Sequence, residues 1–295
     1  MHAVKKAIAI VNTYKPAASE IAKKIQAFLL AKNVHCDIYN YDGISVDDPF
    51  DSYDFGITLG GDGTVLFAAR HCACKKIPVF PVNLGSFGFI AGIQPDAWEK
   101  ALQDYMEGKK HSDSRMLLNA RVVRNDKTLF SSDALNDAVI SGSGLGKIVK
   151  LEVLFNGITF GMYKADGVII STPTGSTAYS AASGGPILAP DLSAFVLTPI
   201  CSFSLSNRPI VLPSNGTMKI TVMDMRHKNA MLTIDGQELF PIEEGDSVYV
   251  SEAPDRVNLI GCDANVFYGA LRSKLNWSGA PVSSEPDFPD GGIHA

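Results

Sequence analysis

The sequence has no long hydrophobic run, no set of paired cysteines and no excess of positive charge, and each absence excludes a class of protein. No stretch approaches the ~18 apolar residues that are needed to span a membrane. The apolar start of the chain stops at Asn12 without a small-residue cleavage site, so we interpret it as a first strand rather than a signal peptide. The formal net charge of −5 disfavours a general affinity for nucleic acid or for anionic membranes.

The five cysteines are scattered, and only Cys72 and Cys74 lie close together. A structural zinc site usually has a wider first gap and a second pair of cysteines, which this sequence lacks. We therefore predict reduced thiols, no metal ligands from the protein and a cytoplasmic location.

The length of 295 residues predicts about two domains. Strands alternate with helices in the first third of the chain, which predicts parallel pairing in an open α/β (Rossmann-like) sheet. In such a sheet, ligands bind beyond the carboxyl ends of the strands. The expected strands are 7–11, 34–39, 55–59 and 77–82, and the expected helices are 19–32, 65–72 and 98–105.

After about residue 110 the pattern changes to short β-like runs separated by turn residues, which predicts a β-rich, sandwich-like half. One helix is expected to interrupt it, opening near Gly175 and running through 179–183. We expect an α/β domain at 1–110, a β-rich domain at 111–265 and a disordered tail at 278–295. The β-like runs are 120–124, 127–131, 138–140, 149–155, 158–163, 167–171, 218–223, 231–234 and 248–250.

Gly60-Gly61-Asp62-Gly63-Thr64 lies between a predicted strand and a predicted helix. Glycines allow close approach of the backbone, and the start of a helix offers free N–H groups, which suits a phosphate. Asp62 does not suit a phosphate by itself, because two anions repel, so its presence indicates a hydroxyl nucleophile, a metal ion or both. A carboxylate aimed at a hydroxyl can orient it and accept its proton during phosphoryl transfer. The alternative is a tight turn in which Asp62 only caps the helix.

Three segments in the middle of the chain have both a ligand-binding and a plain structural interpretation. The loop that begins at Asn83 is glycine-rich and lies close to a ligand or is a simple connection. The pair Asn136-Asp137 can hold ribose hydroxyls or form an ordinary turn. Residues 142–147 fail both the phosphate-loop and the dinucleotide patterns, so we interpret them as a connection in which Lys147 can still touch a ligand.

The segment 171–180 has five Ser and Thr hydroxyls between Ser171 and Tyr179. These hydroxyls can cap a helix or bind a ligand, and Tyr179 can stack on a ring or donate its hydroxyl. Capping explains part of the pattern, but the density of hydroxyls exceeds what a cap needs. Just before it, Asp166 can bind an amide or ribose edge or be a surface carboxylate of a hairpin.

Taken together, these segments resemble the NAD kinase family over about residues 5–277. The resemblance implies an N-terminal α/β domain and a C-terminal β-rich domain with NAD in the crevice between them, and residues 266–277 returning to the first domain. Family members are homodimers or homotetramers. The matching positions are Gly60–Thr64, Asn83-Leu84-Gly85, Gly88-Phe89, Arg115–Leu118, Asn136-Asp137, Asp166-Gly167, Ser171–Tyr179, Gly184-Gly185-Pro186 and Asp235-Gly236-Gln237.

The resemblance also implies roles for single residues. Asp62 would act on the adenosine ribose 2′-hydroxyl, Asn136 and Asp137 would hold ribose hydroxyls, and Asp166 the nicotinamide end. The sequence departs from the family at Ser86, where Arg is common, and at Asp137, which replaces the commoner Glu. The expected ligand contacts are Gly61, Gly63, Thr64, Phe67, Asn83, Asn136, Asp137, Lys147, Lys164, Asp166, Thr174, Ser176, Thr177, Ala178, Tyr179, Ser180, Ala182 and Gln237.

The leading hypothesis is transfer of the ATP γ-phosphoryl group to NAD, giving NADP, with Mg²⁺ neutralising the donor phosphates. A lipid or sphingoid-base kinase shares the Gly60–Thr64 turn, as does a phosphofructokinase-like sugar kinase. Both leave the segment 171–179 unexplained, and a lipid kinase would also need a lipid entry surface. A catalytically silent NAD(P) sensor is the third possibility, although Asp62 and Asn136 are intact.

Overall fold

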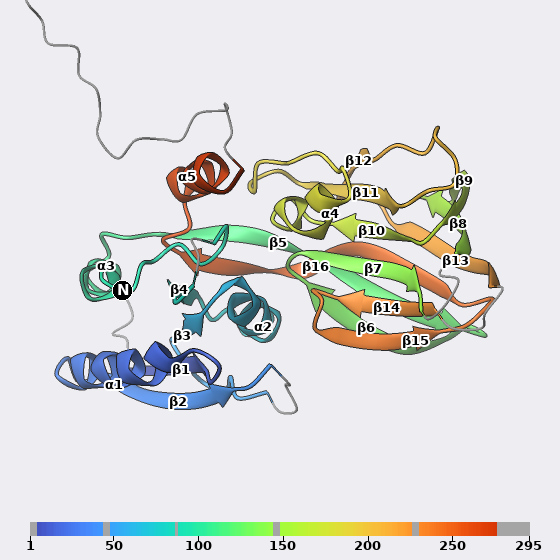
Figure 1. The fold of residues 1–295 in the computed structure, drawn as a ribbon. Helices are drawn as coiled ribbons and strands as arrows, with labels where there is room; N and C mark the ends of the chain where they lie inside the picture. The colour runs from blue at the N-terminus through green and yellow to red at the C-terminus, as the bar shows by residue number, and fades with distance from the viewer. Residues whose placement is uncertain (1–4, 44–47, 86–87, 144–147, 226–229, 276–295) are drawn as a thin grey trace, which may run out of the picture.

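The computed structural model describes residues 5–43, 48–85, 88–143, 148–225 and 230–275 (Figure 1). The tail predicted at 278–295, Ser86 and Lys147 lie outside these ranges. The described chain forms an α/β half and a β-rich half that lie side by side, as predicted.

In the N-terminal half, β1, β2, β3 and β4 pair in parallel in the order β2-β1-β3-β4. Alternate residues of β1 face opposite sides: Ile8 and Ile10 pack with α2, and Ala9 packs with α1 and α3. Helices therefore cover both faces of the sheet. The elements are β1 (Lys6–Asn12), α1 (Pro16–Leu30), β2 (His35–Tyr41), β3 (Phe55–Gly60), α2 (Asp62–Ala73), β4 (Val79–Asn83) and α3 (Trp98–Met106).

The C-terminal half contains strands of two sheets that pack face to face. One sheet has the order β12-β11-β10-β7-β14-β15, and the other continues the N-terminal sheet through β16, β13, β8 and β9, with β5 and β6 beside β16. The elements are β5 (Ser112–Arg124), β6 (Lys127–Ala134), β7 (Asp137–Gly142), β8 (Val149–Phe155), β9 (Ile158–Ala165), β10 (Gly167–Ser171), η1 (Gly175–Thr177), α4 (Tyr179–Ala182), β11 (Ala194–Ile200), β12 (Ile210–Pro213), β13 (Met218–Met225), β14 (Ala230–Ile234), β15 (Glu238–Ile242), β16 (Ser247–Ile260) and α5 (Ala264–Leu275).

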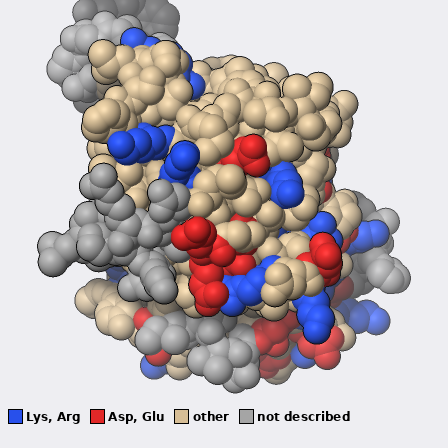
Figure 2. Space-filling view, turned by 90° about the vertical axis from the view of Figure 1, so that its right-hand side faces the viewer, with Lys and Arg blue, Asp and Glu red and all other residues tan. Residues whose placement is uncertain are grey.

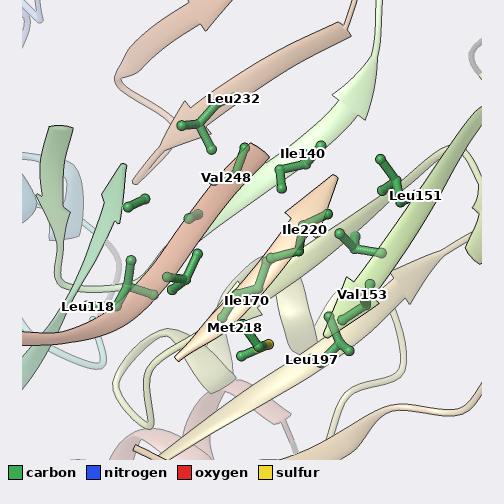
Figure 3. Packing of buried hydrophobic residues seen from close by; sticks show 14 of the residues in the cluster. Leu118, Ile140, Leu151, Val153, Ile170, Leu197, Met218, Ile220, Leu232 and Val248 are labelled. Carbon is green, nitrogen blue, oxygen red and sulfur yellow. The ribbon is translucent and has the colours of Figure 1, made fainter. Parts of the chain in front are cut away.

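The core of the C-terminal half lies between these two sheets (Figure 3). Leu118 and Ile220 come from the sheet that continues into the N-terminal half. Ile140 and Leu232 come from the six-stranded sheet. All four side chains are completely buried. The sandwich is thus held by apolar side chains from both inner faces, as the β-like runs predicted.

The long strand β16 joins the two halves. Its Val248 packs in the sandwich core, whereas its Leu259 packs in the α/β core and pairs in parallel with Val79 of β4. The helix α5 follows directly and leads back to the α/β half, where Phe267 lies against Phe89 with ring centroids 6.2 Å apart. The junction between the halves is therefore built from segments far apart in the sequence.

The sequence prediction differs from the structure in several elements. Helix α2 begins at Asp62, three residues earlier than expected, so the catalytic candidate is its first residue. The helix expected through 179–183 is a 3-10 turn and a four-residue helix, separated by Ala178 with non-helical dihedral angles. The expected strands omitted β11, β12 and β15 and covered only part of β5 and β16.

The surface carries charges of both signs. Figure 2 shows one end of the β-rich half, where basic and acidic side chains lie among one another in the lower part of the described face. All five cysteines are free thiols. Within the described ranges, no helix is both long and apolar enough to cross a membrane.

Candidate active site

Asp62 is anchored by backbone groups from outside its own helix. Its Oδ2 accepts a hydrogen bond from the Phe89 N–H (3.2 Å), and its Oδ1 accepts one from the Ala91 N–H (3.1 Å). At the start of α2, which is fully described, no side chain makes a capping hydrogen bond. The alternative that Asp62 only caps the helix therefore does not describe this side chain.

The glycines of the Gly60–Thr64 turn lie in different surroundings. A Cβ at Gly60 would overlap Thr64 Oγ1, which is buried and accepts a hydrogen bond from Asn12 Nδ2 (3.2 Å). Beside Gly61, by contrast, a Cβ would meet no atom within 4 Å. Thr64 thus secures the turn from inside, while the backbone at Gly61 and Gly63 stays accessible at the positive end of α2.

Gly88 leaves the room that the Asp62 carboxylate occupies, since a Cβ at Gly88 would overlap Asp62 Oδ1. We predict that Gly88→Ala turns this carboxylate away and lowers turnover at least about tenfold, because a displaced catalytic group loses its alignment. The melting temperature should also fall, because the displaced carboxylate gives up its hydrogen bonds from the Phe89 and Ala91 N–H groups. Steady-state kinetics and thermal unfolding measure the two effects, and unchanged turnover would contradict this account of the contact.

A cavity of about 540 Å³ opens in front of Asp62, and we call it the Asp62 cavity. Thr174 lines it, and the buried hydroxyl of this residue has no hydrogen-bond partner in the described structure. Lys274 of α5 supplies the one cationic side chain among the described residues that line it. The lining includes Asp62, Phe89, Asn136, Thr174, Ala178 and Lys274.

A second cavity of about 410 Å³ adjoins the first, and we call it the Asp137 cavity. Asn136 and Ala178 line both cavities, so the two meet at these residues. Along β7, Asp137, Val139 and Ser141 point to the same face because strand side chains alternate. Tyr179 lines the opposite wall and is 46 % exposed, so its ring is available to a ligand.

The Asp137 carboxyl is buried next to a second acidic group. Burial and, to a smaller extent, the nearby Asp235 raise the pKa of Asp137 to about 7. Burial also raises the pKa of Asp235, while Arg70 and three backbone N–H groups act in the opposite direction. The Asp137 cavity therefore contains a carboxyl group whose charge changes near neutral pH.

The raised pKa of Asp137 predicts how the stability of the protein depends on pH. Between about pH 4 and pH 7 the folded protein keeps the Asp137 proton that the unfolded chain loses, so this group lowers the free energy of unfolding as the pH rises. The side chain of Asp137→Asn cannot ionise. The free energy of unfolding of this variant, relative to that of wild type, should therefore rise by at least about 1 kcal/mol as the pH increases from about 4 to 7. Urea unfolding at pH 5 and pH 8 measures the difference. The exposed Asp96→Asn is the control, and an equal pH response in both variants would contradict the prediction.

Most hydroxyls of the segment 171–180 are used inside the protein. Ser176 Oγ donates to the Pro173 carbonyl (2.6 Å), and Thr177 Oγ1 donates to the Thr174 carbonyl (3.2 Å). Thr172 Oγ1 donates to the Leu135 carbonyl (2.5 Å), and Ser180 Oγ pairs with Thr198 Oγ1 (2.8 Å). These four hydroxyls are therefore used inside the protein, but not as the expected helix caps, because neither N-cap residue, Thr174 of η1 nor Ala178 of α4, makes a side-chain capping hydrogen bond.

Several expected ligand contacts lie away from both cavities. Phe67 is completely buried and stacks on Tyr41 with ring centroids 4.4 Å apart. Lys164 Nζ lies 4.5 Å from the centre of the Phe203 ring. Asn83 is also buried, and its Oδ1 accepts a hydrogen bond from the Gly85 N–H (2.9 Å). Ser176, Ser180, Asp166, Ala182 and Gln237 do not line either cavity.

The structure adds residues to the site that the sequence reasoning missed. Val139 and Ser141 could have been found, because they alternate with Asp137 along one predicted strand. Lys274 carries no motif that marks it. Among the described residues, no group of three or more His, Cys, Asp or Glu side chains could hold a metal ion.

A carboxylate anchored at a glycine-rich helix start, in the lining of a cavity that also includes Asn136, fits a phosphotransferase of the kinase type. Comparison with known families agrees. The model of the ATP-NAD kinase N-terminal domain matches residues 46–110, and that of the ATP-NAD kinase C-terminal domain matches residues 135–262. The chain belongs to the ATP-NAD kinase family.

Two relatives and two solved structures illustrate the similarity. The chain is 55 % identical to a Treponema denticola NAD kinase over 278 residues, covering 94 % of this chain and 98 % of the relative. It is 48 % identical to a Treponema pallidum NAD kinase, covering 94 % of this chain and 92 % of the relative. These matches do not support the lipid-kinase and sensor alternatives.

The fold is similar to that of yeast NADH kinase complexed with NADH, with a TM-score of 0.85 and 22 % identity over 95 % of this chain and 89 % of the other. It is also similar to an Archaeoglobus fulgidus NAD kinase in complex with ATP, with a TM-score of 0.74 and 21 % identity over 91 % of this chain and 99 % of the other. At this level of identity, the similarity concerns the fold.

Proposed function

We propose that the protein transfers the γ-phosphoryl group of ATP to the 2′-hydroxyl of the adenosine ribose of NAD, giving NADP. The observation that carries the proposal is the position of Asp62, whose anchored carboxylate lines the same cavity as Asn136. Membership of the ATP-NAD kinase family supports NAD as the acceptor.

The acceptor ribose would bind where the two cavities meet. Asn136 can donate and accept hydrogen bonds to vicinal hydroxyls, and Asp137 can do the same while its carboxyl group is protonated. Asp62 would then orient the 2′-hydroxyl and accept its proton as the phosphoryl group is transferred.

The donor phosphates would lie at the start of α2, because the first N–H groups of a helix have no partner within the helix and suit an anion. Lys274 would contribute positive charge from the opposite wall of the cavity. Mg²⁺ fits this site as an ion held by the donor phosphates, because the described residues include no group of three or more His, Cys, Asp or Glu side chains that could hold it. The ion would neutralise the charge of the donor phosphates.

The test is to incubate the purified protein with NAD, ATP and Mg²⁺ and to detect NADP with a glucose-6-phosphate dehydrogenase readout. Formation of NADP that needs all three components would support the proposal. Tight binding of NAD without NADP would instead favour a sensor. Parallel reactions with NADH and with polyphosphate determine the acceptor and donor preference.

We also propose that the protein works in the cytoplasm as a homodimer or homotetramer. Its five free thiols fit a reducing compartment. We further propose that residues 1–110 together with 266–277 form the α/β domain, and that residues 111–265 form the β-rich, NAD-binding domain. Size-exclusion chromatography with light scattering measures the number of subunits, and a monomer at micromolar concentration would contradict the assembly.

A further inference from the structure

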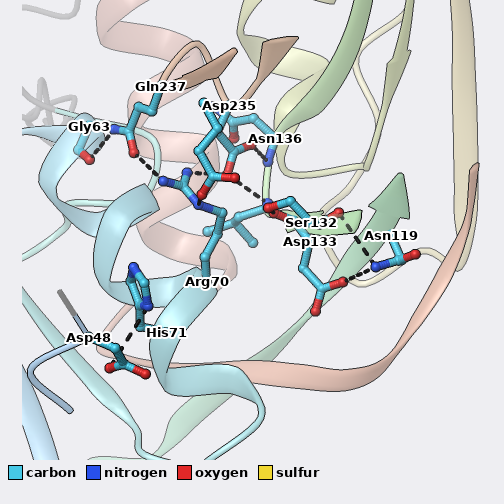
Figure 4. A network of polar contacts seen from close by, with 12 residues as sticks. Asp48, Gly63, Arg70, His71, Asn119, Ser132, Asp133, Asn136, Asp235 and Gln237 are labelled. Atoms are coloured by element: carbon cyan, nitrogen blue, oxygen red, sulfur yellow. Dashed lines mark hydrogen bonds and ion pairs between the residues drawn. The ribbon is translucent and has the colours of Figure 1, made fainter. Parts of the chain in front are cut away.

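Three polar side chains connect helix α2 with the hairpin between β14 and β15 (Figure 4). Arg70 Nη1 donates to Asp235 Oδ2 (3.1 Å), and Arg70 Nη2 donates to Gln237 Oε1 (2.8 Å). The Arg70 side chain is only 5 % exposed and that of Asp235 is not exposed at all. We call Arg70, Asp235 and Gln237 the Arg70 clamp.

On one side, the clamp holds the backbone that carries the ribose-binding candidates. Asp235 accepts hydrogen bonds from the N–H groups of Leu135 (3.0 Å), Asn136 (2.7 Å) and Asp137 (3.1 Å). The Asp235 N–H in turn donates to the Asp137 carbonyl (2.9 Å). The start of β7 is therefore fixed by one buried carboxylate.

The hairpin turn explains why this carboxylate lies where it does. Asp235 and Gly236 both have positive φ, 51° and 67°, and the Gln237 N–H donates to the Ile234 carbonyl (2.9 Å). Positive φ at both central residues is the geometry of a type I′ turn, in which Asp-Gly is favoured. This turn brings Asp235 and Gln237 together toward α2.

On the other side, the clamp holds the helix that begins with Asp62. Gln237 Nε2 donates to the carbonyl of Gly63 (2.7 Å), directly after Asp62. Arg70 lies about two turns further along the same helix and is also 3.3 Å from Glu238 Oε1. The hairpin thus contacts α2 in its first turn, at Gly63, and again in its last turn, at Arg70.

We propose that Arg70 and Gln237 are positioning residues that keep Asp62 in register with Asn136 and Asp137. The inference rests on the proposed function. Asp62 comes from the α/β half and the ribose-binding pair comes from the β-rich half, so their alignment depends on contacts across the junction. A displacement of about 1 Å between reacting groups can lower turnover about 100-fold. In this role the Gln237 amide acts through the protein and not as a direct ligand contact.

The main test compares Arg70→Met with Arg124→Met. Arg124 also donates two hydrogen bonds to a distant segment, both to Asp246, through Nε to Oδ1 (2.7 Å) and Nη2 to Oδ2 (2.9 Å). It is the last residue of β5 and lines neither cavity. We expect Arg70→Met to lower kcat about 10- to 100-fold, with a smaller change in KM for NAD. Arg124→Met should lower the melting temperature but leave kcat within about twofold, since it breaks a pair outside the site.

A double mutant distinguishes positioning from a general loss of structure. If the clamp acts through Asp62, Arg70→Met added to Asp62→Asn should cost less than about threefold in kcat, because residues that act as a unit are not additive. Gln237→Leu keeps the Arg70–Asp235 pair and removes the link to Gly63, so it tests the proposal even if Arg70→Met does not fold. We expect it to lower kcat about 3- to 10-fold.

Unchanged kcat in Gln237→Leu and in a folded Arg70→Met, with an active wild type, would overturn the clamp and leave the proposed function intact. A full multiplicative loss in the double mutant would overturn the route through Asp62. A wild type that forms no NADP would contradict the proposed function itself.

Discussion

Asp62→Asn is expected to lower turnover at least about 100-fold while the dissociation constant for NAD stays within about tenfold of wild type, because a general base contributes to the reaction and little to binding. The amide nearly preserves the shape of the carboxylate. It can still accept a hydrogen bond from the Phe89 N–H or the Ala91 N–H, but its NH₂ group opposes the other one. Initial rates of NADP formation and a binding titration with NAD measure the two quantities.

Asp263→Asn is the matched control for this variant. Asp263 also lies at the start of a helix, where its Oδ1 accepts a hydrogen bond from the Val266 N–H (3.1 Å), so it is a true helix cap. Asn caps helices about as well as Asp, and the control should keep turnover within about twofold. Retained turnover in Asp62→Asn would show that Asp62 is not the base.

The two halves of the fold were predictable because their hydrophobic patterns differ. The strands that escaped prediction contain prolines, which disfavour a strand interpretation, whereas the apolar run 77–82 was predicted as a strand in spite of its two prolines. Pro199 lies in β11 and Pro241 lies in β15, while the pairing of β16 with β5 shifts between Glu252 and Arg256, around Pro254. In each case the surrounding sheet overrides the local signal.

The candidate site, too, was predictable only in part. Asp62 and Asn136-Asp137 were predicted from their own chemistry, and the structure brings them to adjoining cavities. The hydroxyls of Ser176 and Ser180 stand out in the sequence, yet Ser176 donates to the nearby Pro173 carbonyl and Ser180 pairs with Thr198 of β11. The order of residue types does not reveal that these hydroxyls have partners inside the protein.

Contacts between distant segments were beyond the sequence reasoning. Arg70 pairs with Asp235, which lies 165 positions away, and Lys274 reaches the Asp62 cavity only because α5 returns to the α/β half. Neither residue belongs to a local pattern. Gln237 was noticed for its motif, but the interaction that the structure gives it is with Arg70 and Gly63.

The close approach of Gly175 to Asn136 leads to the second large expected effect. A Cβ at Gly175 would overlap the carbonyl oxygen and carbon of Asn136, and both atoms belong to backbone. That carbonyl already accepts a hydrogen bond from the Thr172 N–H (2.9 Å), so it has little freedom to move. Gly175→Ala should therefore push the turn with Thr174 and Ala178 away from Asn136, at the point where the two cavities meet.

We expect Gly175→Ala to lower the free energy of unfolding by about 1–3 kcal/mol, the usual cost of overpacking, and to weaken NAD binding at least about tenfold. Urea unfolding and a binding titration measure the two losses. Gly269→Ala is the matched control, because a Cβ there would meet no atom within 4 Å and alanine favours the helix α5. If Gly175→Ala behaved like this control, the close approach of Gly175 to Asn136 would not be needed where the two cavities meet. A loss of both NAD affinity and stability would show that this contact maintains the NAD site.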